Sequence, residues 1–213
     1  MFFQVIFCTS FCISLYAFWV LTQKYLSTDT SAKKNIIDRL HDSYYVSIIN
    51  RYLLDNINAA RFHIALTTFL IDANVVGVFA ICIFGYDIEM YDRIKPIFLI
   101  LTGVILRQIC QFINRLPKPK GIVWFDPGFP TFLMEYSVSD DFFFSGHTLI
   151  SLITGVAIYQ FTESYLWKMY AIIFSIYEIG FVIVSKAHYF MDVYAAITTF
   201  FTLNYVFDNL LKN

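Results

Sequence analysis

Long apolar stretches constrain the fold of this chain more than any other feature of its sequence. A helix needs about 20 mostly apolar residues, at about 1.5 Å per residue, to cross about 30 Å of hydrocarbon. Of the 213 residues, 58% are hydrophobic, which is not typical of a water-soluble domain. Six stretches are long enough, which predicts an all-α integral membrane bundle of six transmembrane helices. The stretches are Phe2–Gln23, Ile64–Gly85, Ile94–Ile113, Phe142–Phe161, Leu166–Val184 and Phe190–Leu211.

The polar stretches between these segments do not divide the chain into domains. Within residues 24–63, apolar residues recur every three to four positions, which predicts amphipathic helices at the membrane surface. Residues 114–140 hold all but one of the five prolines and are predicted to form a loop. We therefore expect residues 1–213 to form one transmembrane domain, with its functional motifs within residues 107–194.

Several classes of function are not expected. The four cysteines lie inside apolar stretches, and the sequence has no Cys-x-x-Cys pair or cluster of metal-ligating residues. We therefore expect no disulfide framework, no metal and no cofactor. The net charge is −1 and no block of basic residues occurs, so a nucleic acid is not an expected partner.

Two histidine motifs stand where predicted segments begin. "SGHT" (residues 145–148) begins the fourth segment, and "SKAHYFMDV" (residues 185–193) leads into the sixth. Because each crossing reverses the side, both motifs reach the same face of the membrane. His188 and Asp192 are four residues apart, so on a helix the carboxylate could accept a hydrogen bond from the imidazole. Such a carboxylate makes the other ring nitrogen a better nucleophile or base.

Both helix starts suit a phosphate. The first N–H groups of a helix have no partner within it, and the positive end of the helix dipole lies there. Ser145 suits an N-cap, and Gly146 allows the main chain to approach a ligand closely. Beside such a pocket, His147 and His188 predict phosphoryl chemistry, in which one histidine attacks phosphorus and the other protonates the leaving oxygen.

The remaining polar residues are weaker candidates. Asp72 and Arg107 fall inside predicted segments, where charges are costly and a functional or paired role is expected. Arg107 either binds the phosphate or pairs with an acid, and for Asp72 structural pairing is an equal alternative. We interpret His41 and His63 as surface or helix-end residues rather than ligands.

The two motifs resemble those of a known enzyme superfamily. "SGHT" followed about forty residues later by "HYFMD" looks like the type-2 phosphatidic acid phosphatase superfamily of lipid phosphatases and phosphotransferases. The chain is more similar to its sphingomyelin synthases and plant phosphatidylcholine:diacylglycerol cholinephosphotransferases, through Arg107 ahead of "LPKP", Asp141 ahead of "SGHT", and "AHYFMDV". "DRLHD" (residues 38–42) resembles a motif of the synthases more weakly.

The resemblance implies transfer of a phosphorylated lipid head group through a phosphohistidine. It implies His188 as the nucleophile, Asp192 as its orienting residue, and His147 as the acid that releases diacylglycerol and the base that activates the acceptor. The donor would be a phosphatidylcholine-like lipid and the acceptor diacylglycerol or ceramide, without a cofactor. The expected substrate-binding residues are Arg107, Asp141, Ser145, Gly146, Lys186 and Tyr189.

Two other functions stay open, namely a lipid phosphate phosphatase and a non-catalytic lipid-binding membrane protein. The arginine that phosphatases place six residues before the second histidine is Val182 here, which weakens the case for hydrolysis. We expect a multi-pass membrane protein, in the endoplasmic reticulum or Golgi if eukaryotic, and leave open a homodimer. The face with both motifs collects eleven of the fifteen Lys and Arg, which favours a cytosolic site.

Overall fold

The computed structural model describes most of the chain from residue 36 onward. The described residues are 13–14, 17–18, 21, 36–85, 88–114, 116–129, 131 and 143–211. The predicted segment Phe2–Gln23 therefore lies almost entirely outside the described residues, as does Asp141. The described residues form six helices and no strand. The helices are α2 (Tyr44–Asp55), α3 (Ile57–Phe84), α4 (Met90–Ile113), α5 (Gly146–Phe161), α6 (Tyr165–Val184) and α7 (Phe190–Leu211).

The described helices confirm an all-α membrane bundle. Helices α3, α4, α6 and α7 are long and apolar enough to cross a membrane. Helix α5 corresponds to the predicted segment Phe142–Phe161 but begins only at Gly146, which leaves it 16 residues, or about 24 Å at the usual rise. The number of crossings stays a prediction.

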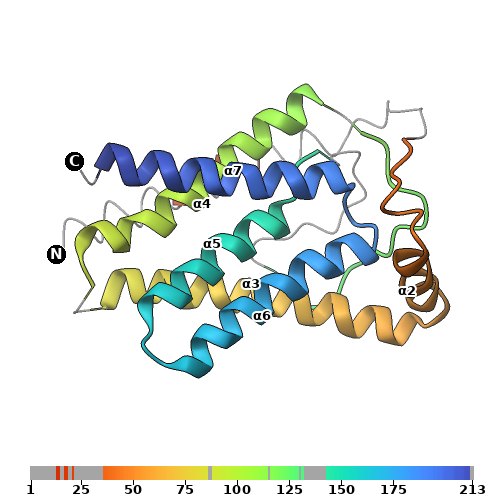
Figure 1. Ribbon diagram of the computed structural model, residues 1–213, viewed down its shortest axis with the longest axis horizontal. Coiled ribbons are helices and arrows are strands. Elements are labelled where there is room, and N and C mark those ends of the chain that lie inside the picture. The colour runs from red at the N-terminus through yellow and green to blue at the C-terminus, as the bar shows by residue number, and fades with distance from the viewer. Residues whose placement is uncertain are drawn as a thin grey trace.

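Helix α5 lies at the centre of the bundle although it is the shortest of the apolar helices. It packs against α3, α4, α6 and α7 (Figure 1). Helix α2 lies across one end of the bundle, where it contacts α3 and α6 (Figure 1). The end of α6 and the start of α7 lie at this same end (Figure 1). The two histidine motifs are therefore carried to one end of the molecule.

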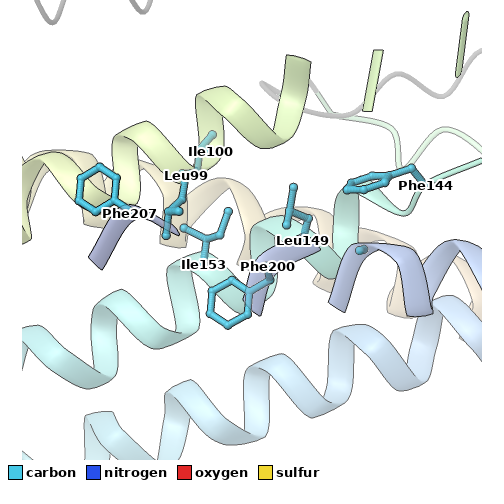
Figure 2. Close-up of a cluster of buried hydrophobic side chains, with 8 residues drawn as sticks. Leu99, Ile100, Phe144, Leu149, Ile153, Phe200 and Phe207 are labelled. Atoms are coloured by element: carbon cyan, nitrogen blue, oxygen red, sulfur yellow. The ribbon is translucent and has the colours of Figure 1, made fainter. Parts of the chain in front are cut away.

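A cluster of apolar side chains fixes α5 against α4 and α7. Figure 2 shows Leu149 and Ile153 of α5 beside Leu99 of α4 and Phe200 of α7. Phe144, just before α5, is buried in the same cluster. Close packing of these buried side chains holds the start of α5 in place independently of its polar contacts.

Helix α3 buries polar as well as apolar side chains and exposes several large apolar ones. Thr67, Thr68 and Asp72 are buried, whereas Phe69 and Val76 are exposed. Apolar residues on the outer face are expected where lipid replaces water as the solvent. His63 of α3 is half-buried and bonds the Tyr177 hydroxyl of α6 at 2.8 Å. It therefore joins α3 to α6.

Small residues allow close contact between α5 and α6. A Cβ atom on Gly155 would lie 2.3 Å from Ser175 Oγ and 3.2 Å from the Ala171 main-chain oxygen. Ser175 Oγ also donates a hydrogen bond to the Ser151 main-chain oxygen at 3.1 Å. Close approach of this kind is how small residues stabilise helix pairs in membranes.

We expect Gly155→Ala to lower the melting temperature of the purified protein. The added methyl group must displace Ser175 Oγ from its hydrogen bond, and overpacking costs about 1–3 kcal/mol. Gly180→Ala is the matched control, because a Cβ atom there meets nothing within 4 Å. Thermal unfolding in detergent, followed by size-exclusion chromatography, measures both. Equal melting temperatures would contradict the close contact.

Candidate active site

The starts of α5 and α7 are joined directly. The main-chain N–H of Ser145 donates a hydrogen bond to the main-chain oxygen of Asp192 at 3.2 Å. The charges of His188 and Arg107 both act on the His147 imidazole, which places these three side chains near one another. The structure thus brings together His147, His188 and Asp192, the three residues predicted to be catalytic.

The His188 and Asp192 side chains form the predicted pair. Nδ1 of His188 lies 3.4 Å from Oδ2 of Asp192, and the carboxylate is fully buried. The same oxygen accepts a hydrogen bond from the Tyr189 main-chain N–H at 3.0 Å. A proton on Nδ1 satisfies the contact with the carboxylate, which leaves the lone pair on Nε2 of His188.

His147 lies in the first turn of α5. Ser145 caps this helix, since its side chain accepts a hydrogen bond from the Thr148 N–H at 3.3 Å. The edge of the Trp124 ring faces the His147 ring, with centroids 5.0 Å apart and planes at 83°. No described residue bonds to Nε2 of His147. This nitrogen is therefore available to exchange a proton with a ligand.

Arg107 covers the start of α5. A Cβ atom on Gly146 would lie 3.2 Å from Arg107 Nε, so a larger residue there would displace the Arg107 side chain by a few tenths of an ångström. Among the described residues, none accepts a hydrogen bond from the main-chain N–H of Gly146 or His147. Main-chain donors at a helix start beside an arginine suit an anion such as a phosphate diester.

Contrary to the prediction from the sequence, the start of α7 does not offer its main-chain N–H groups to a phosphate. The Phe190 N–H donates to Oδ2 of Asp38 at 2.6 Å, and the Tyr189 N–H donates to Asp192. Carboxylates therefore already occupy these donors, and the prediction that both helix starts offer them to a phosphate is wrong for α7. Of the two helix starts, only that of α5 keeps main-chain donors that an anion could bind.

Of the two alternatives for His41, a surface or a helix-end residue, the first is wrong, whereas its place three residues before α2 agrees with the second. Only 5% of His41 is exposed, and its Nε2 lies 3.0 Å from the His188 main-chain oxygen. Burial lowers the pKa of His41, although the nearby Asp38 carboxylate opposes this shift. The neutral ring with a proton on Nε2 donates to His188. In the sequence, the weak "DRLHD" resemblance was the signal for Asp38 and His41.

Tyr189 and Lys186 flank His188 in different ways. The Tyr189 hydroxyl donates to the Pro117 main-chain oxygen at 2.9 Å. Burial, with the Asp192 and Asp38 carboxylates nearby, raises the pKa of Tyr189 to about 12, so its hydroxyl keeps its proton. Lys186 is half-buried and adopts the left-handed φ of 54°. Tyr189 therefore anchors the loop between α6 and α7, and Lys186 gives this loop a positive charge.

A comparison with protein families bears on the same region. The family model described as PAP2 superfamily C-terminal matches residues 140–210, which include His147, His188 and Asp192. The match supports the PAP2-like superfamily. This superfamily is enzymatic, with lipid phosphatase and phosphotransferase activities. Searches of curated proteins and of solved structures gave no match.

The match begins after Arg107, Trp124, Asp38 and His41. The family match therefore does not bear on these four residues, and their place near the two motifs rests on their contacts. Trp124 lacked a distinctive sequence signal, because aromatic residues make up 20% of the chain. Within the described part of the chain, no group of three or more His, Cys, Asp or Glu is placed to hold a metal ion.

We expect vanadate, which resembles a phosphoryl group in transfer, to raise the melting temperature of the wild-type protein. Arg107→Gln should weaken this binding about tenfold or more, since it removes a charge-assisted hydrogen bond. Arg61→Gln is the control, because Arg61 is exposed on α3. Equal vanadate affinity in the two variants, measured by thermal shift at increasing vanadate, would exclude Arg107 from the anion site.

Proposed function

We propose that the chain is a lipid head-group phosphotransferase. It would move phosphocholine, or a similar phosphorylated head group, from a phospholipid to the hydroxyl of diacylglycerol or ceramide. The observation that carries this proposal is the pairing of His188 with buried Asp192 beside His147 and Arg107. The superfamily match supports the broader class, lipid phosphatase or phosphotransferase.

The first step forms a phosphohistidine. The lone pair on Nε2 of His188 attacks phosphorus in line, and the bond from phosphorus to the diacylglycerol oxygen breaks. His147, protonated on Nε2, donates its proton to that leaving oxygen. Asp192 accepts the Nδ1 hydrogen bond and stabilises the positive charge that develops on the His188 ring.

The second step passes the head group to the acceptor. His147, now neutral, takes the proton of the acceptor hydroxyl, and the resulting oxygen attacks the phosphorus. The nitrogen–phosphorus bond breaks, so His188 regains its lone pair and His147 its proton. Throughout both steps Arg107 and the N–H groups of Gly146 and His147 would hold the phosphoryl oxygens.

The charge of the site favours a phosphodiester over a monoester. A phosphate monoester brings about two negative charges at neutral pH, and Val182 replaces the arginine that phosphatases use to neutralise them. A choline-bearing diester brings one negative charge and a quaternary ammonium. The face of an aromatic ring attracts such a cation by about 0.5–2 kcal/mol, and Trp124 offers a ring beside His147. We propose that it is a multi-pass membrane protein, located in the endoplasmic reticulum or Golgi if eukaryotic.

Head-group transfer tests the roles of the histidines. We expect His188→Ala and His147→Ala to lower transfer from labelled phosphatidylcholine by at least about a thousandfold, because both steps need both residues. His63→Ala is the control, since His63 bonds the Tyr177 hydroxyl and is given no role in the proposed mechanism. Mass spectrometry of lipid extracts from purified protein in nanodiscs measures the products. Full activity in either site variant would refute the mechanism.

Competing substrates separate the proposal from a lipid phosphate phosphatase. We expect the purified protein to transfer the head group of phosphatidylcholine and to release little phosphate from phosphatidic acid. Phosphate release from phosphatidic acid without head-group transfer would favour the phosphatase instead. A non-catalytic lipid-binding protein would leave both lipids intact and form no labelled phosphohistidine.

A further inference from the structure

A turn far from both motifs in the sequence lies against the loop that carries His188. This turn spans residues 38–42 and precedes α2. Oδ1 of Asp38 accepts hydrogen bonds from the main-chain N–H groups of Leu40 at 2.9 Å and His41 at 3.4 Å. One carboxylate oxygen thus stabilises the turn itself.

The other oxygen of Asp38 reaches α7. It accepts the hydrogen bond from the Phe190 N–H, at 2.6 Å. Phe190 begins α7, so the carboxylate caps a helix start, where unpaired N–H groups and the helix dipole favour a negative charge. Asp38 therefore couples the turn to the helix that carries Asp192.

His41 holds the other side of the same loop. Its Nε2–H donates to the His188 main-chain oxygen at 3.0 Å, and its ring stacks on Tyr189 with centroids 5.8 Å apart. The Asp38 and His41 contacts therefore lie on the two sides of Tyr189. Asp192 binds the N–H of Tyr189 between them.

We propose that Asp38 and His41 are positioning residues that hold His188 for in-line attack on phosphorus. This inference rests on the proposed function. Both residues act through the main chain of residues 188–190 rather than through the phosphate. In-line displacement depends steeply on position, and a shift of about 1 Å costs about a hundredfold in rate.

Four variants separate the contacts. Asp38→Ala removes the cap of α7, and His41→Phe keeps a ring against Tyr189 but lacks the donor. We expect kcat for head-group transfer to fall about 10- to 100-fold in both, with little change in KM. His41→Gln replaces the donor, so we expect it to recover most of the lost kcat. Asp42→Asn is the matched control, because Asp42 lies exposed in the same turn.

Hydrogen–deuterium exchange gives a measurement that does not depend on activity. We expect the Phe190 amide of the full chain in detergent to exchange faster in Asp38→Ala than in the wild type or in Asp42→Asn. Mass spectrometry of peptides that cover residues 186–194 measures this rate. Exchange within α5 should change less, since the cap contacts α7.

The outcomes are distinct. Unchanged exchange in Asp38→Ala would overturn the contact, and faster exchange with full kcat would overturn the positioning role. A lower folded yield with full kcat in the remaining protein would overturn it as well. If the wild type transfers no head group, the proposed function fails. In that case exchange alone decides whether the turn holds α7.

Discussion

The hydrogen bond from the Ser145 N–H to the Asp192 main-chain oxygen joins the two halves of the candidate site. It fixes the start of α5 against the start of α7, although the two residues are far apart in the sequence. His147 and His188 come together only because these two helix starts meet. Each histidine alone would be an ordinary polar residue at a helix end, and the chemistry depends on their shared location.

The apolar surroundings strengthen the polar contacts of the site. Helix α5 is enclosed by four other helices, so the first turn with His147 is buried although it lies near an end of the bundle. Water is largely excluded there, and buried polar groups that lack a partner are costly. The Asp192 carboxylate, the Ser145 cap and the Arg107 guanidinium group all lie beside the two histidines. A charged phosphodiester would bind among them under the proposed function. The same exclusion of water would protect a phosphohistidine from hydrolysis.

Much of the fold could be predicted from the sequence, because long apolar stretches and helix-start motifs are local signals. The predicted segments from α3 onward correspond to observed helices, and the order of the motifs predicted that His147, His188 and Asp192 would meet. Contacts between distant residues could not be predicted in this way. Asp38 caps α7 across 152 positions, and nothing local marks it as a cap for that helix. The apolar run alone placed the start of α5 at Phe142, whereas Ser145, which the sequence offered as an N-cap, caps this helix at Gly146.

The configuration at phosphorus tests the central claim, a covalent intermediate on His188, most directly. The donor would be a phosphatidylcholine analogue with one phosphate oxygen replaced by sulfur, in a single configuration. Each in-line displacement inverts the configuration, so two successive displacements predict retention in the transferred head group. Inversion in the product would show a single displacement and would contradict a phosphohistidine on His188.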